Sequence, residues 1–385
     1  MSAQTLSQPP VIPRQSKKIF YIDNLKVGLI ALVILHHALI TYGAIGDWYY
    51  TQKTALPAAA TPMLLIVIID QSFFMGFFFF LSAYFVPGSF HKKGAARFMK
   101  DRLVRLGVPL VFYSVALSPV LIYLVYNVGE GHHVSFIRFL GGFHDWIDFG
   151  VLWFVAALLL FTLFYVLSQF RSKTARSKPR PAPSSGAILA FAAAIGILSF
   201  LVRVVFPIGW KLNPLGFQLA HFSQYIALFI LGIVAARNNW LETFPFDKGI
   251  RFLRYSLRLL LIFPVILVIE RIAGTPDAWF TGGWHWQQFI YAVWEQLMGF
   301  SIIVTLLTVG RKWWNRSSSF MAGLSRNAFA VYIFHPLVLV SLALLFRNWG
   351  VEPALKFLVV APLAVVGTFL LAAVITRIPG VRRIV

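Results

Sequence analysis

Ten apolar stretches, each long enough to cross a lipid bilayer, constrain what this chain can fold into. A spanning helix needs about 20 mostly apolar residues, and it satisfies its own backbone polar groups where lipid cannot. Hydrophobic residues make up 59% of the chain and charged residues only 12%. We therefore predict an all-α integral membrane protein, a bundle of about ten transmembrane helices, and exclude a soluble fold. The stretches lie approximately at residues 20–42, 62–86, 103–126, 150–170, 186–206, 217–236, 254–272, 288–309, 325–346 and 354–376.

The Lys and Arg residues indicate which way the helices cross the membrane. An even number of spans places both termini on the same side. With the termini in the cytoplasm, 26 of the 34 basic residues fall in cytoplasmic segments and seven, setting Lys26 aside, fall at the other face. The positive-inside rule therefore predicts cytoplasmic N- and C-termini. Because cytoplasmic Lys and Arg face anionic lipid, most of the formal charge of +21 is explained without a nucleic-acid partner.

The polar segments predict two tails around one membrane domain. We expect a cytoplasmic N-terminal tail (1–19), a ten-helix membrane domain (20–377) and a cytoplasmic C-terminal tail (378–385). The first apolar run is longer than that of a cleaved signal peptide, so it is expected to stay as a helix. Residues 171–186, rich in Pro, Ser and basic residues, are expected to be a mobile cytoplasmic linker between two groups of five spans. The absence of cysteine excludes disulfides and thiolate chemistry.

The first span carries a lysine and two histidines within its apolar run. Lys26 and His37 are eleven residues apart, which places them roughly 16 Å apart and within about 20° of the same helix face. A charged group at membrane depth costs on the order of 3 kcal/mol or more and often marks a pathway, a site or a buried pair. The alternative is that Lys26 extends to the membrane surface and that His36 or His37 bonds a neighbouring helix.

Two carboxylates inside other spans are candidate partners for these histidines. Asp70 in the second span and Glu295 in the eighth are expected in the outer half of the membrane, where His36 and His37 also lie. A carboxylate beside a histidine orients and polarises it, as general-base catalysis requires. We therefore take His37, His36, Asp70 and Glu295 as the candidate catalytic residues.

Other histidines favour structural explanations. His335 precedes Pro336 within a span, where a backbone carbonyl loses its partner and a polar side chain can replace it, so we expect a structural role. The loop between residues 129 and 150 has irregular spacings, and we expect an exposed polar loop rather than a metal site. Its candidate ligands are His132, His133, His144, Asp145 and Asp148.

A phenylalanine-rich span leads directly into a basic patch on the predicted cytoplasmic side. Arg102 and Arg105 are three residues apart at a helix start, so they share a face. A pair of guanidinium groups suits phosphate oxygens. The alternative is an anchor for lipid headgroups.

These segments together resemble the integral-membrane acyltransferase 3 family. The first span resembles a pattern in which a basic residue, here Lys26, precedes a histidine, here His37, by eleven positions. The order and spacing of the other matches agree from the first span to the ninth. Those segments are FFFLSAYF (78–85), RLVRLGVP (102–109), LWFV (152–155) and YIFHP (332–336).

The resemblance implies a membrane O-acyltransferase. Such an enzyme moves a short acyl group, acetyl or succinyl, from cytoplasmic acyl-CoA to a hydroxyl of a glycan, glycolipid or small molecule, without a metal. It implies that His37 is the general base and that the donor is bound by Lys26, Ser82, Arg102 and Arg105. The short extracellular ends look closest to the periplasmic-glucan succinyltransferase branch, which implies the bacterial inner membrane.

This chain departs from the family pattern at two positions. Lys26 stands where arginine is usual, which removes bidentate geometry. Ala83 stands where glycine is usual, which leaves slightly less room for close approach. The choice between His36 and His37 also stays open, because adjacent helix residues point about 100° apart.

Two other function classes fit parts of the sequence. A proton-coupled transporter or flippase would use Lys26, His37, Asp70 and Glu295 as a substrate or proton pathway. It predicts substrate movement without acyl-CoA consumption, and many such proteins carry an internal repeat that we do not find here. A purely structural membrane protein would leave the aligned polar groups unexplained.

Overall fold

The computed structural model describes residues 19–171 and 179–384 and confirms the predicted membrane bundle. Within these residues ten helices are long and apolar enough to cross a membrane. The predicted N-terminal tail up to residue 18, the linker residues 172–178 and Val385 lie outside the described residues. The spanning helices are α1 (Phe20–Tyr42), α2 continued by α3 (Pro57–Tyr84, Val86–Lys93), α4 to α6 (Ala95–Arg102, Val108–Phe112, Ser118–Leu124), α8 (Trp153–Arg171), α9 (Ser185–Val205), α10 (Phe222–Arg237), α12 (Phe246–Ile272), α14 (Trp286–Trp313), α15 (Ser319–Leu345) and α16 (Pro353–Ile375).

Four short α-helices lie between or after the spanning helices. They are α7 (Phe136–Gly141), α11 (Trp240–Thr243), α13 (Ala278–Thr281) and α17 (Val381–Ile384). The side of the membrane on which the termini lie stays a prediction from the basic residues.

Some spanning helices extend beyond the apolar stretches that predicted them. α12 begins at Phe246 and α14 ends at Trp313. The added turns carry basic residues such as Lys248, Arg311 and Lys312. Hydropathy ends a span at its first charges, whereas helical hydrogen bonding continues into the headgroup region, so part of the predicted basic loops is helix.

The third span is distorted by π-helical turns. They lie at Leu103–Gly107, Tyr113–Leu117 and Val125–Gly129, between α4, α5, α6 and the following loop. Pro109 and Pro119 follow the first two turns closely, and each removes a backbone N–H that a regular helix would use. The first turn begins directly after Arg102 and contains Arg105, so the distortion falls where the predicted phosphate-binding pair lies.

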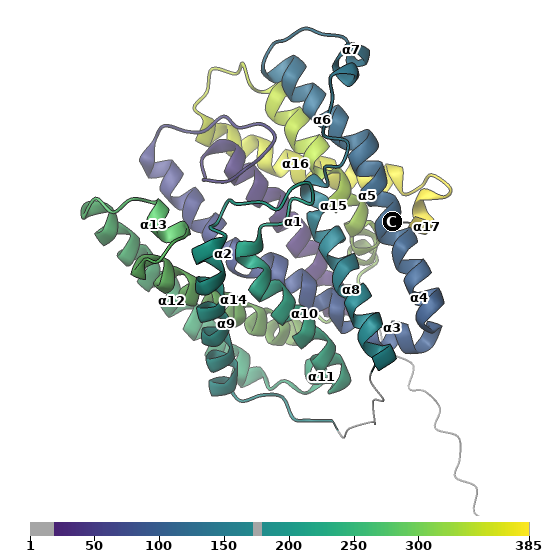
Figure 1. Ribbon diagram of the computed structural model, residues 1–385, viewed down its shortest axis with the longest axis vertical. Helices are drawn as coiled ribbons and strands as arrows, with labels where there is room; N and C mark the ends of the chain where they lie inside the picture. Colours follow the sequence, from purple (N-terminus) through teal and green to yellow (C-terminus); the bar gives the residue numbers. More distant parts are fainter. Residues whose placement is uncertain (1–18, 172–178, 385) are drawn as a thin grey trace, which may run out of the picture.

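The first helix, α1, lies inside the bundle and contacts helices from both the early and the late part of the chain (Figure 1). α1 packs against α2, α14, α15 and α16, and α2 in turn packs against α10 and α14. The two groups of five spans on either side of the linker therefore interleave. The described end of the linker is also held in place, because Trp240 donates to the carbonyl of Arg180 and Lys248 to that of Pro183.

Glycines allow α2 to lie unusually close to its neighbours. A Cβ at Gly299 of α14 would meet the backbone carbonyl of Ser72, and one at Gly232 of α10 would meet the carbonyl of Phe80. Small residues are the common means of close helix packing in membranes. Ala83 faces Gly232, so the methyl group that departs from the family pattern is accommodated against α10.

We predict that Gly299→Ala destabilises the bundle. The added methyl group meets backbone rather than a movable side chain, and overpacking of this kind costs about 1–3 kcal/mol. The check is the midpoint of thermal unfolding in detergent, with Gly28→Ala as control because no atom lies within 4 Å of a Cβ there. An unchanged midpoint for Gly299→Ala would contradict the packing described above.

Candidate functional site

Two cavities lie at the two ends of the polar stripe on α1. A cavity of about 590 Å³ is lined by His36 and His37, and we call it the His37 cavity. A second cavity of about 450 Å³ is lined by Lys26, and we call it the Lys26 cavity. The residues predicted from one helix face therefore belong to two separate spaces along the same helix.

The Lys26 cavity gathers the predicted donor-binding residues. It is lined by Lys26, Ser82, Arg102 and Arg105. Two cations that the sequence had not assigned to the donor, Lys93 and Arg326, also line it, against the single carboxylate of Asp101. Five cations beside one carboxylate make a wall that suits a polyphosphate.

Local contacts hold these cations in place. Lys26 Nζ lies 3.6 Å from Asp23 Oδ1, and Lys93 Nζ donates to Asp101 Oδ2 at 2.6 Å. The guanidinium of Arg102 lies over the ring of Phe98, 5.3 Å from its centroid. Lys26 and Lys93 line the cavity and their side chains stay partly exposed, so these contacts leave both ammonium groups within reach of an anionic ligand.

Of the two neighbouring histidines, His36 is the one that meets Asp70. Asp70 Oδ2 lies 3.6 Å from His36 Nδ1, and both side chains are buried. The ring of Phe74 packs on His36 at 4.7 Å between centroids. His36 lines the His37 cavity whereas Asp70 lies behind it, so this carboxylate acts on the cavity through His36.

His37 is held by aromatic stacking. Its ring lies 4.0 Å from that of Trp48 and 5.3 Å from that of His335, with interplanar angles of 16° in both cases. Among the described residues, no hydrogen-bond partner reaches its buried Nδ1. The ring is therefore fixed in position by packing rather than by a hydrogen bond to Nδ1.

His335 has the structural role predicted from its proline neighbour. Its Nδ1 lies 2.7 Å from the carbonyl oxygen of Tyr332, the group that Pro336 leaves without a helical N–H donor. If Nδ1 donates, Nε2 carries a lone pair, and this atom has no partner among the described residues. The side chain thus repairs the helix and also supports His37 by stacking.

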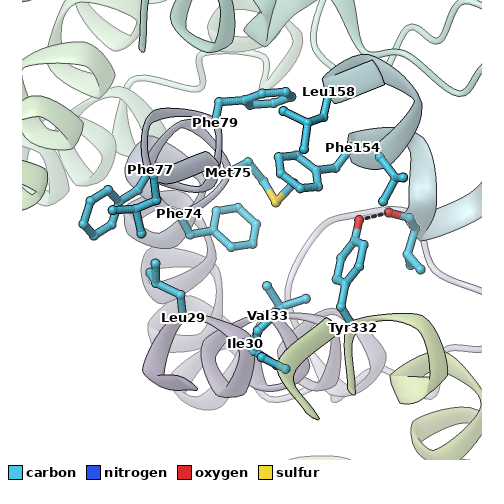
Figure 2. Close-up of a cluster of buried hydrophobic side chains, with 14 of the residues drawn as sticks. Leu29, Ile30, Val33, Phe74, Met75, Phe77, Phe79, Phe154, Leu158 and Tyr332 are labelled. Carbon is cyan, nitrogen blue, oxygen red and sulfur yellow. Dashed lines mark hydrogen bonds between the residues drawn. The ribbon is translucent and has the colours of Figure 1, made fainter. Parts of the chain in front are cut away.

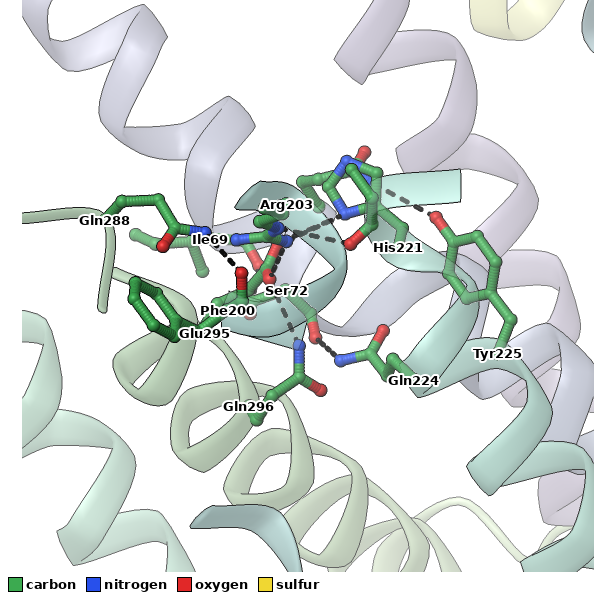
Figure 3. A network of polar contacts seen from close by, with 12 residues as sticks. Ile69, Ser72, Phe200, Arg203, His221, Gln224, Tyr225, Gln288, Glu295 and Gln296 are labelled. Carbon is green, nitrogen blue, oxygen red and sulfur yellow. Dashed lines mark hydrogen bonds and ion pairs between the residues drawn. The ribbon is translucent and has the colours of Figure 1, made fainter. Parts of the chain in front are cut away.

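Glu295 lies in a different cluster from His36 and His37 (Figure 3). Its Oε2 accepts from the Arg203 guanidinium, and its Oε1 lies 3.4 Å from His221 Nδ1. Arg203 and Glu295 are almost completely buried, whereas His221 lines the His37 cavity. The expected histidine–carboxylate contact exists here, but with a histidine that the sequence analysis did not consider.

One signal in the sequence pointed to this cluster. Arg203 lies inside an apolar stretch, and a buried carboxylate such as Glu295 needs an opposite charge. The orientation argument treated Arg203 as one of the basic residues at outer helix ends, so its pairing with Glu295 was not considered. His221 has no comparable signal, because a histidine at the start of a span is common.

The loop between residues 129 and 150 supplies Asp148 and Gly150 to the wall of the His37 cavity. Among the described residues, no group of three or more His, Cys, Asp or Glu is arranged to hold a metal. Asp148 lines the cavity and accepts from Ser118 Oγ at 2.9 Å and from the Gly150 N–H at 2.8 Å. On the same wall, burial raises the pKa of Tyr49 above its ordinary value, so its hydroxyl holds its proton more firmly than a free tyrosine does.

A layer of apolar side chains lies between the two cavities, and Figure 2 draws several of them, among them Ile30, Val33 and Met75. On α1, Val33 lines the His37 cavity and Ile30, one turn away, lines the Lys26 cavity. On α2, Met75 lines the His37 cavity and Phe78 lines the Lys26 cavity. The layer is therefore about one helical turn thick.

Tyr332 of α15 is the residue common to both cavities. In the described part of the chain, no other residue lines both spaces. Its hydroxyl donates to the backbone carbonyl of Val151, just before α8 (Figure 2). The sequence analysis included Tyr332 in the segment YIFHP but gave it no role, because an uncharged tyrosine beside an apolar helix face carries no charge signal.

Comparison with known families identifies the family of this chain. A family model described as an acyltransferase domain matches residues 19–377, which contain all ten spanning helices. The chain belongs to the acyltransferase 3 family. It is therefore a multi-pass membrane acyltransferase. Searches of curated proteins and of solved structures give no match.

We predict that Glu295→Gln destabilises this acyltransferase. The change leaves Arg203 buried without a counter-charge, and breaking a buried ion pair costs about 3–5 kcal/mol. Thermal unfolding in detergent should show a large fall in the midpoint, and adding Arg203→Met should recover part of it. Glu130→Gln, which changes an exposed carboxylate, is the control. Equal midpoints for Glu295→Gln and Glu130→Gln would argue against a stabilising pair.

Proposed function

We propose that this acyltransferase binds acyl-CoA in the Lys26 cavity and transfers its acyl group to a hydroxyl acceptor in the His37 cavity. One observation carries the proposal: the cation-lined cavity and the histidine-lined cavity meet across one layer of side chains on the same helix. A donor with a charged head and a long thin arm fits two spaces arranged in this way.

The donor's phosphates suit the cations of the Lys26 cavity. Arg102 and Arg105 bring planar guanidinium groups, which bind phosphate oxygens in pairs, and Lys26 adds a single ammonium. Toward the layer that separates the two cavities, the lining of the Lys26 cavity is apolar and includes Ile30 and Phe154. We therefore place the charged end of acyl-CoA beside the cations and its acyl end beside the apolar layer that separates the two cavities.

His37 is the general base in this proposal. It takes the proton of the acceptor hydroxyl while the oxygen attacks the thioester carbonyl. The carbon–sulfur bond then breaks, and the CoA thiolate leaves and takes up the proton. The reaction needs no protein nucleophile, consistent with a chain that has no cysteine.

The other candidate catalytic residues have supporting roles in this proposal. His36 lies beside His37, with 5.5 Å between ring centroids, and the Asp70 carboxylate, 3.6 Å from His36 Nδ1, acts on this histidine electrostatically. Glu295 acts through His221 on another part of the cavity wall. We retain acetyl and succinyl as acyl groups and a glycan, glycolipid or small molecule as acceptor, in a bacterial inner membrane.

We predict that purified protein transfers label from acyl-CoA and that His37→Ala largely abolishes this transfer. Radiolabelled acetyl-CoA and succinyl-CoA are supplied separately, with a cell-envelope extract as acceptor. Loss of a general base lowers kcat by about 10²–10⁴-fold, whereas KM for acyl-CoA should change little. His132→Ala, which changes an exposed loop histidine, is the matched control.

The same assay separates the enzyme from a transporter. A transporter or flippase moves its substrate without consuming acyl-CoA. Absence of both transfer and thioester hydrolysis with either donor, together with no effect of His37→Ala, would therefore overturn the proposed function.

We predict that Arg102→Ala weakens donor binding. The change removes a charged hydrogen-bond donor to phosphate, so KM for acyl-CoA should rise roughly tenfold or more while kcat changes little. Lys100→Ala removes an exposed cation from the same helix that does not line the cavity, and it is the control. An equal KM for both variants would place the donor's phosphates elsewhere.

A further inference from the structure

We propose that the acyl-pantetheine arm of the donor passes between the two cavities at Tyr332, and that the hydrogen bond from Tyr332 to Val151 closes this passage when no donor is bound. The inference rests on the proposed function, because it takes acyl-CoA as the molecule that passes. It adds a defined crossing point to that function.

The closed layer has to open for the proposed reaction to occur. A general base acts within hydrogen-bond reach, about 3 Å between heavy atoms, of the hydroxyl whose proton it removes. The donor's cations line the Lys26 cavity, whereas His37 lines the other cavity. As the layer stands, a thioester in the Lys26 cavity and the histidine lie on opposite sides of packed side chains. Some part of that layer must move.

Tyr332 is the part of the layer best suited to move. Tyr332 lines both cavities, so displacing its ring joins them. Ile30 and Val33 each line one cavity and lie on the buried face of α1, so moving either of them would join the cavities less directly. Its hydroxyl also makes the polar contact that ties α15 to Val151. The other side chains drawn across the layer are apolar and packed within the core (Figure 2).

The chemistry of the arm compensates for breaking that contact. A buried hydroxyl without a partner is costly, so Tyr332 would not leave Val151 for an apolar ligand. The pantetheine arm carries amide groups and ends in a thioester carbonyl, and each offers an acceptor to the tyrosine hydroxyl. Opening by an arm of this class therefore exchanges one hydrogen bond for another.

The absence of native cysteine makes a direct test possible. A single cysteine replaces Gln71, which lines the His37 cavity, and a separate variant carries Ser89→Cys in the Lys26 cavity. A charged methanethiosulfonate reagent that does not cross membranes is added to one side of sealed vesicles. Modification of Cys at position 89 identifies the side to which the Lys26 cavity opens.

The gate is tested by changing Tyr332 in the position-71 cysteine variant. With Tyr332 intact, reagent on the Lys26-cavity side should modify this cysteine very slowly. Tyr332→Phe should raise that rate roughly fivefold through loss of one hydrogen bond, and Tyr332→Ala should raise it further. Phe329→Ala, which enlarges the Lys26 cavity alone on the same helix, is the control and should leave the rate unchanged. Equal rates in all four backgrounds would overturn the gate.

The passage of the arm is tested by adding acetyl-CoA on the Lys26-cavity side. It should protect the cysteine at position 89 and, in the Tyr332→Ala background, also the cysteine at position 71, because the arm fills the opened passage. Protection at position 89 alone would overturn the passage while supporting the donor site. Protection at neither position would overturn the donor site of the proposed function, and with it the arm as occupant, whatever the effect of Tyr332→Ala.

Discussion

The distance between α2 and its neighbours α10 and α14 sets the positions of both cavities. Backbone contacts at Gly232 and Gly299 leave no space for a Cβ, so α2 is fixed against two helices at once. From this helix Asp70 reaches His36 beside one cavity, and Ser82 lines the other. A shift of α2 would therefore disturb the histidine side and the cation side together, which links the packing of small residues to both halves of the proposed chemistry.

Hydropathy was sufficient to predict the ten spanning helices because lipid leaves few alternatives to a helix. It was less informative about their ends, since turns that carry Lys248 or Arg311 continue as helix beyond the apolar stretch. The packing of α1 against both early and late helices was not predictable from one sequence. It depends on side-chain shape, such as the fit of Ala83 against Gly232, and no local pattern records which helix will be the neighbour.

Some features of the candidate site were predictable from the sequence, and others were not. Lys26, Ser82, Arg102 and Arg105 were predicted as a group and line one cavity, because charge and motif mark them in the sequence. The assignment of partners was harder: a helix face does not show that Asp70 meets His36 or that Glu295 meets Arg203. Tyr332 begins one of the family-like segments, but no charge marks it, and the position of its ring between two spaces is visible only in the structure.

The thin layer at Tyr332 also affects how the membrane voltage acts on this protein. An electric field across a membrane falls mainly over the part that water does not enter. Filled with water from opposite faces, two cavities that nearly meet would concentrate that fall on about one helical turn. Moving a unit charge through the full voltage changes its energy by about 2.3 kcal/mol per 100 mV. A proton released on one side of the layer and taken up on the other would therefore couple acyl transfer to the electrical state of the cell.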